Sequence, residues 1–225
     1  MFKKLVNLFF VNRCAVCKKP CRDAICKDCL KGVKPLDLGC CHKCGKPIHS
    51  CICKDLKVHF EKCVSAYRYE QSAISSAIYK LKEKGNRQVV WFFADAMVLR
   101  LNDQYNNTKF DFVTFVPTTR KKKRAKGFDH AEILAKAVSK RIGVKCVAPP
   151  FKRKGKSAQK YLSRAVRDKN AESAFVLNGK TICGRVLLVD DVITTGVTLS
   201  YAAGLVKKAG ANEIYCLTAA TSTKK

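Results

Sequence analysis

One stretch, VLLVDDVITTGVTLSYAAG from Val186 to Gly204, constrains the fold of this chain most. Its four apolar residues, Val186–Val189, predict a buried strand that leads directly into the adjacent carboxylates of Asp190 and Asp191. A loop rich in Thr and Gly follows, and residues 198–209 have the pattern of a helix. A strand, an acidic pair, a loop and a helix in this order predict a ligand site at the carboxyl end of a parallel strand.

Helical and strand patterns alternate through the rest of the chain after residue 64. Asp129 followed by Glu132 predicts a capping box at the start of one helix. The helical stretches are residues 72–101, interrupted by a turn at 84–86, and the helix that follows Asp129 and stops at Gly143; the strands are residues 110–116, 186–189 and 214–220. This alternation predicts the α/β class, with a parallel sheet flanked by helices.

Cysteines mark off a small N-terminal module, because eleven of the 14 lie before residue 64. We therefore expect a zinc-ribbon module over residues 1–63 and the α/β domain over residues 64–225. Each CxxC pair directs two thiolates to one point, and tetrahedral zinc needs four ligands. Sequential pairing predicts one or two structural zinc sites, with Cys14, Cys17, Cys26 and Cys29 as one ligand set and Cys41, Cys44, Cys51 and Cys53 as the other.

The zinc interpretation leaves alternatives open. A disulfide framework is disfavoured, because eleven is an odd number and no secretion signal is recognisable. Interleaved ligation would use the same eight cysteines, and Cys40, His42 or His49 is an alternative ligand in the second set. The spare cysteines Cys21, Cys40 and Cys63 have no assigned role.

The loop after the acidic pair predicts a phosphate site. Free backbone N–H groups and the positive end of a helix dipole face outward at such a turn. We expect the 5′-phosphate of a sugar phosphate to be held by Thr194, Thr195, Gly196 and Thr198, while Asp190 and Asp191 accept hydrogen bonds from vicinal ribose hydroxyls. Neither GxxxxGK[ST] nor GxGxxG is present. The alternative is a pair of surface aspartates that cap a helix.

The stretch VLLVDDVITTGVT resembles the phosphoribosyl pyrophosphate signature of type I phosphoribosyltransferases. The paired cysteines, YRYE, YKLKEKGNRQ, FVPTTRKKKRAKGFDHAEILAKAV, QKYLSRAVRDKNAESAFVL and DDVITTG resemble, in this order, the ComF family of competence proteins over nearly the full length. The resemblance implies a zinc ribbon, a phosphoribosyltransferase-like domain, and a role in natural transformation handling single-stranded DNA. One block differs from the family pattern: where the family usually has RGFNQ, this chain has KGFDH at Lys126–His130.

The resemblance also implies phosphoribosyl pyrophosphate with Mg²⁺ as the ligand. Arg120 and Arg124 are then candidates for pyrophosphate contacts, and Arg164 and Arg167 for phosphate contacts from a mobile lid. Asp190 and Asp191 would be the catalytic residues of an active transferase of the glycosyltransferase class. No sequence motif marks a site for the acceptor substrate of a transfer reaction. Whether the domain is an enzyme or a binding module therefore stays open.

The net charge of +28 predicts a polyanionic partner. Single-stranded DNA is the expected partner, and the candidate contacts are Arg120, Lys121, Lys122, Lys123, Arg124 and Lys126. A solvated charged face is the alternative. No stretch approaches the about 18 apolar residues of a membrane span. We therefore expect a cytoplasmic protein, with peripheral attachment to the inner face of the cytoplasmic membrane and contacts with other DNA-uptake proteins as further expectations.

Overall fold

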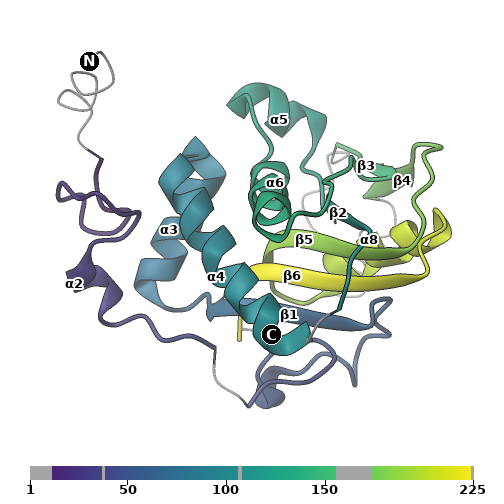
Figure 1. Ribbon diagram of the computed structural model, residues 1–225, viewed down its shortest axis with the longest axis horizontal. Helices are drawn as coiled ribbons and strands as arrows, with labels where there is room; N and C mark the ends of the chain where they lie inside the picture. Colours follow the sequence, from purple (N-terminus) through teal and green to yellow (C-terminus); the bar gives the residue numbers. More distant parts are fainter. Residues whose placement is uncertain (1–11, 37–38, 106–107, 156–173, 224–225) are drawn as a thin grey trace, which may run out of the picture.

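The computed structural model describes residues 12–36, 39–105, 108–155 and 174–223. A parallel sheet lies at its centre, with strand order β1-β6-β5-β2. The strands are β1 (Lys62–Arg68), β2 (Phe112–Phe115), β5 (Arg185–Ile193) and β6 (Glu213–Thr221). The predicted α/β class with a parallel sheet is confirmed (Figure 1).

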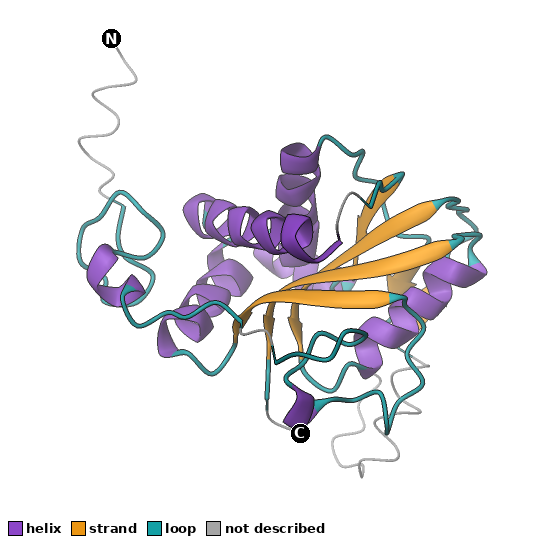
Figure 2. Cartoon of the chain, turned by 60° about the horizontal axis from the view of Figure 1, so that its bottom comes forward, coloured by secondary structure: helices purple, strands orange, loops and turns teal. Residues whose placement is uncertain are grey.

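Helices cover both faces of the sheet (Figures 1 and 2). One face carries α3 (Ser72–Lys84), α4 (Arg87–Tyr105) and α6 (His130–Ile142), and the other carries α8 (Val197–Lys208). Leu187 and Val189 of β5 pack in the first of these apolar layers, whereas Val186 and Leu188 pack in the second. The apolar run of β5 is continuous because both faces of a parallel sheet are buried.

Strand β5 is longer than the sequence predicts. Its pairing with β6 continues from Asp190↔Thr218 to Ile193↔Thr221, so the acidic pair lies within the strand and the loop begins at Thr194. Strand residues alternate between the two faces of a sheet. As a result, Asp190 and Asp191 have different surroundings although they are adjacent in sequence.

The predicted turn between α3 and α4 is confirmed, and it depends on a glycine. Gly85 ends α3 in the left-handed region, with φ of 55°. A Cβ atom on this residue would lie 3.1 Å from the ring of Phe128, so a side chain would be both strained and crowded.

Asp129 caps α6 as predicted, but the reciprocal half of the capping box is wrong. The Asp129 carboxylate accepts hydrogen bonds from the backbone amides of Ala131 (3.1 Å) and Thr118 (2.8 Å). Glu132 instead pairs with Lys123 and Lys136, at 2.5 and 2.7 Å. Asp129 is 2% exposed and thus fixes the segment after β2 against the start of α6.

Several elements were not predicted from the sequence. They are β1, α5 (Arg120–Lys126), the antiparallel pair β3 (Phe151–Arg153) and β4 (Phe175–Leu177), and the short helices α2 (Lys27–Leu30) and η1 (Ile48–Ser50). The basic run Arg120–Lys126, for which no secondary structure was predicted, is therefore helical, and Thr119 caps it by accepting from the Lys122 amide.

The two cysteine-rich segments pack on different parts of the sheet domain (Figure 1). The first lies beside α3, where Lys80 donates a hydrogen bond to the Cys14 carbonyl at 3.3 Å. The second lies next to β1, where the Cys63 amide donates to the Lys43 carbonyl at 2.7 Å. Among the described residues, no helix combines the length and hydrophobicity needed to cross a membrane.

Candidate functional site

A cleft of about 820 Å³ opens at the carboxyl edge of the sheet. Loops after β1, β2 and β5, together with α3, α5 and β3, contribute its walls. Its polar lining comprises Tyr69, Glu70, Ser75, Lys82, Glu83, Thr118, Lys122, Lys126, His130, Arg153, Asp190, Asp191, Thr194, Thr195, Thr198 and Ser222. This is the edge at which ligands bind to open parallel sheets.

Asp191 faces helices α3 and α6 and has a cationic partner. Its Oδ2 atom lies 2.6 Å from Lys82 Nζ, and the Asp191 side chain is only 7% exposed. His130 Nε2 lies 3.8 Å from Asp191 Oδ1, beyond hydrogen-bond distance. Burial lowers the pKa of Lys82, but the charge and hydrogen bond of Asp191 outweigh that effect and raise it.

The Asp190 carboxyl is shifted toward its protonated form. Burial, reinforced by the neighbouring charge of Asp191, raises its pKa well above the usual value. Its Oδ1 atom accepts a hydrogen bond from the Asp191 amide at 2.9 Å. Burial also lowers the pKa of His130 more than the Asp191 and Asp129 carboxylates raise it, so this imidazole is neutral at pH 7.

The loop after β5 leads into the N-terminus of α8. Gly196 precedes α8 with φ of 76°, and no side chain caps its first turn. The amides of the first helical turn have no carbonyl partner within the helix. Thr194, Thr195, Gly196 and Thr198 all line the cleft, as a phosphate loop requires.

The α5 cations at the cleft are not the two that the resemblance assigned to the pyrophosphate. Lys122 and Lys126 of α5 line the cleft, whereas Arg120 and Arg124 lie on other parts of this helix surface and are not among the lining residues. Positions two apart on a helix point in nearly opposite directions, which explains the difference. Arg164 and Arg167 lie outside the described residues.

Lys82, His130 and Arg153 are among the lining residues that were missed from the sequence. Lys82 and His130 fall within blocks that resemble the ComF family, but their spacing from Asp191 carries no sign of contact. Arg153 reaches the cleft from β3, where its guanidinium stacks over the Phe175 ring at 5.2 Å. A three-residue strand has too short a pattern to be recognised.

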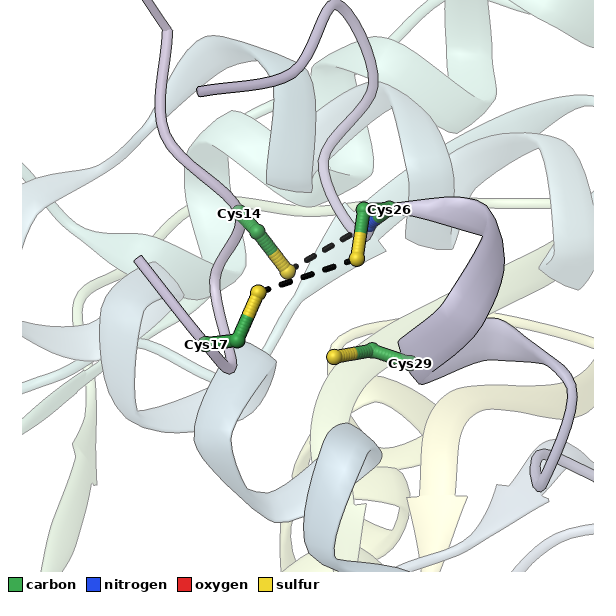
Figure 3. A group of neighbouring side chains, drawn as sticks. All are labelled: Cys14, Cys17, Cys26 and Cys29. Carbon is green, nitrogen blue, oxygen red and sulfur yellow. Dashed lines mark hydrogen bonds between the residues drawn. The ribbon is translucent and has the colours of Figure 1, made fainter. Parts of the chain in front are cut away.

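The eight paired cysteines form two groups of four, Cys14/Cys17/Cys26/Cys29 and Cys41/Cys44/Cys51/Cys53, with all sulfur atoms of a group within 4.8 Å of one another. Figure 3 shows the four sulfur atoms of the first group turned toward a common centre. A tetrahedral Zn²⁺ with Zn–S of about 2.3 Å requires sulfur separations of about 3.8 Å. The Cys17–Cys26, Cys41–Cys53 and Cys44–Cys51 separations are 3.7, 3.8 and 3.7 Å.

The electrostatics of these groups also suit a metal cation. Burial raises the pKa of the Cys14 thiol, but hydrogen bonds from the amides of Cys26 and Val16 outweigh it and lower the pKa to about 6. Hydrogen bonding to Cys26 and the Cys14 thiolate raise the pKa of Cys29 to about 12. Four thiolates repel one another without a cation, so each group could hold zinc.

The grouping is sequential, not interleaved, and contains only cysteines. Cys21 donates a hydrogen bond to the Asp23 carbonyl at 3.0 Å, and Cys63 is buried at the start of β1. Neither of these two spare thiols belongs to a group of four.

Comparison with known proteins agrees with this architecture. The family described as "Phosphoribosyl transferase domain" matches residues 129–225. "Competence protein F" of Haemophilus influenzae is 26% identical over 219 residues, which cover 92% of this chain and 95% of that protein. "DNA utilization protein YhgH" of Escherichia coli is 24% identical over 150 residues, 64% of this chain and 66% of its own length.

Other similarities are more local. "Putative ribose-phosphate pyrophosphokinase 2" of Lactococcus lactis is 38% identical over 72 residues, and the match spans 29% of this chain and 22% of that protein. Among solved structures, adenine phosphoribosyltransferase of Saccharomyces cerevisiae has a TM-score of 0.39 and 18% identity, covering 60% of this chain and 70% of that one. The purine phosphoribosyltransferase of Pyrococcus horikoshii has a TM-score of 0.37 and 22% identity, covering 60% of this chain and 85% of that one.

The parallel sheet, the acidic pair and the loop into α8 therefore define a phosphoribosyl transferase domain. Two groups of four cysteines precede it, and the similarity to Competence protein F covers 92% of the chain. The chain is a ComF-like protein.

The cysteine geometry predicts two zinc ions per chain. Cys14→Ser with Cys17→Ser should leave one zinc, and Cys41→Ser with Cys44→Ser should also leave one, because each pair belongs to a different group. Elemental analysis of purified protein and a colorimetric zinc-release assay measure this. Loss of all zinc from either double variant, or a single zinc in the unmodified protein, would contradict two independent groups.

The raised pKa of Asp190 predicts a pH-dependent cost of its burial. Above the ordinary aspartate pKa of about 3.9 the unfolded chain releases a proton that the folded chain retains, so the stability contribution falls as pH rises toward the folded-state pKa. Asp190→Asn should therefore raise Tm, by an amount that grows as pH rises above about 4, the ordinary aspartate pKa. Asp191→Asn is the control, and it should lower Tm because Lys82 loses its partner. A Tm difference for Asp190→Asn that does not change with pH contradicts this assignment.

Proposed function

We propose that this chain handles single-stranded DNA in natural transformation and binds phosphoribosyl pyrophosphate with Mg²⁺ in the cleft. Residues 1–63 form the zinc-binding module and residues 64–225 the ligand-binding domain in this proposal. One observation carries it: an acidic pair and a phosphate loop share a cleft that is also lined by Lys82, Lys122, Lys126 and Arg153.

Each part of the cleft suits one part of this ligand. The loop at Thr194, Thr195 and Thr198 offers hydroxyl and amide donors to the 5′-phosphate. Asp190 and Asp191 accept hydrogen bonds from the ribose hydroxyls, and Lys122 and Arg153 are cations for the pyrophosphate.

The donor set fits Mg²⁺ bound together with such a ligand. Mg²⁺ typically takes one or two carboxylates together with substrate phosphates. Lys82 is the cation that contacts Asp191 in the ligand-free protein, and the high pKa of Asp190 favours its protonated form. Arrival of a divalent cation would favour the ionised form of Asp190 and make binding release a proton.

A second candidate function is phosphoribosyl transfer with release of pyrophosphate to an unknown acceptor. Magnesium would then offset the charge of the leaving group. The carboxyl of Asp191, a buried residue that is 5% exposed, favours this candidate, because a desolvated carboxylate stabilises the positive charge that develops at the anomeric carbon.

The DNA part of the proposal is supported by charge and by the printed names of two relatives, "Competence protein F" and "DNA utilization protein YhgH". Helix α5 projects four cations without an acidic partner among the described residues: Arg120, Lys121, Lys122 and Arg124. Lys123 and Lys126 differ, because they pair with Glu132 and Glu83 at 2.5 and 2.7 Å.

Zinc-loaded protein should bind Mg²⁺-phosphoribosyl pyrophosphate in a calorimetric titration. The variant with both Asp190→Asn and Asp191→Asn should bind at least about 100-fold more weakly, because it lacks the charges that orient the ribose and metal. Pyrophosphate release, followed with and without a single-stranded oligonucleotide, separates the two candidates. Release that requires both aspartates supports the transferase. Binding without release in either condition supports the ligand-bound DNA-handling protein, and no binding contradicts both.

Replacing Arg120, Lys121, Lys122 and Arg124 by Gln should weaken single-stranded DNA binding and flatten its salt dependence. Each lost phosphate contact reduces the slope of log K against log salt by roughly 0.7, so four contacts reduce it by up to roughly 3. Fluorescence anisotropy with an oligonucleotide at several salt concentrations measures both quantities.

The matched control removes the same charge elsewhere, at the exposed residues Lys140, Lys180, Lys207 and Lys208. Lys140, Lys207 and Lys208 lie in the last turns of α6 and α8, and Lys180 precedes β5, all at the amino edge of the sheet. Equal weakening in both variants would show that net charge, and not the surface of α5, governs DNA binding.

A further inference from the structure

Lys46 is a buried lysine in the second cysteine-rich segment, two residues after Cys44. Its side chain is 1% exposed, and its ammonium donates hydrogen bonds to the carbonyls of Thr194, at 2.5 Å, and of Ser222. A buried charge is costly unless its hydrogen bonds are made. The two carbonyls therefore fix the ammonium to one place in the fold.

These two carbonyls belong to the edge of the sheet that forms the cleft. Thr194 is the first residue after β5 and Ser222 the first after β6, and the Ser222 amide donates to the Ile193 carbonyl at 2.9 Å. Ser222 Oγ also donates to Glu70, after β1, at 2.7 Å. Lys46 thus links the carboxyl ends of neighbouring strands from behind the cleft.

The direction of the Thr194 carbonyl matters for the loop. The C=O and N–H groups of one trans peptide unit point in opposite directions. When the Thr194 carbonyl is turned to Lys46, the Thr195 amide of the same peptide unit is turned away from Lys46. Both Thr194 and Thr195 line the cleft, so this orientation presents an N–H group to an anion there.

A second contact from the same segment reaches the same loop. Ile52 lies between the ligand positions Cys51 and Cys53, and a Cβ atom on Gly196 would lie 2.1 Å from Ile52 Cδ1. The absence of a side chain at Gly196, with its φ of 76°, is what allows Ile52 to pack against the loop.

The segment itself is held close to β1. Gly45 has φ of 68°, and a Cβ atom there would lie 2.2 Å from the Cys63 carbonyl oxygen. The position of Lys46 is thus set by the turn that carries Cys41 and Cys44 and by its close approach to β1.

We infer that the second group of four cysteines, through Lys46 and Ile52, is a structural part of the phosphate loop, and that Lys46 is a positioning residue for phosphate binding. The first group has no such role, because it contacts α3 through Lys80. This inference rests on the proposed function in taking the loop at Thr194–Thr198 as the 5′-phosphate site.

Hydrogen–deuterium exchange of the ligand-free, zinc-loaded full chain tests the positioning role without any ligand. Lys46→Met should speed exchange in peptides that contain residues 194–198 by about tenfold, because the Thr194 and Ser222 carbonyls lose their buried hydrogen-bond partner. Peptides of the first cysteine-rich segment should be unchanged, and zinc content should stay at the wild-type value. Lys80→Met is the matched control and should leave the 194–198 loop unchanged. Loop exchange equal to wild type in Lys46→Met overturns the inference.

Ile52→Ala gives a second test if Lys46→Met does not fold. It should speed exchange in the same loop, and no change there would also contradict the inference. Calorimetry with ribose 5-phosphate then measures function: Lys46→Met should bind about tenfold more weakly and Lys80→Met as well as wild type. If wild type itself does not bind ribose 5-phosphate, the proposed ligand is wrong, whereas the exchange result still decides whether the second group supports the loop.

Discussion

The parallel direction of all four strands in the central sheet is the constraint on which the site depends. Because β1, β6, β5 and β2 run the same way, their carboxyl ends meet at one edge. Residues far apart in sequence, such as Glu70, Thr118, Asp191 and Ser222, therefore line one cleft. The continuous apolar run Val186–Val189 makes this arrangement stable, because helices bury both faces of β5.

The exposed surface and the cleft of this protein differ in how their charged groups are arranged. The net charge of +28 makes the surface attractive to polyanions, and most of its cations are exposed and screened by solvent. The cleft, in contrast, holds two adjacent carboxyls that burial keeps from ionising together, with Lys82 compensating one of them. In the function proposed above, an anionic ligand with a divalent cation would satisfy both the carboxyls and the surrounding lysines. Lys122 and Lys126 join this cleft to the basic surface of α5.

Helices and strands that carry a long hydrophobic pattern, or a clear glycine or capping residue at their ends, were predicted correctly. The helix pair around Gly85, the Asp129 cap and the β5–loop–α8 unit all carry such patterns, and the structure confirms them. Strand β1 and the β3–β4 pair were missed, because β1 follows the cysteine-rich segment without a boundary and β3 has only three residues. The capping box failed in part because Glu132 gains more from Lys123 and Lys136 than from the helix amide. The sequence did not show which cations of α5 line the cleft, since a helix was not expected there and its rotation decides which side chains face the cleft.

The sequence by itself determined the chemistry that each segment carries: four-thiolate groups in the first part, an acidic pair after an apolar strand, and a loop suited to phosphate. These features are local, so spacing and residue type are enough to recognise them. Tertiary structure alone decided which distant groups meet. It pairs Lys82 with Asp191 and buries Lys46 against the Thr194 carbonyl, 148 residues away in the chain. No periodicity encodes such contacts, because they arise only when the helices and the second cysteine-rich segment pack on the sheet.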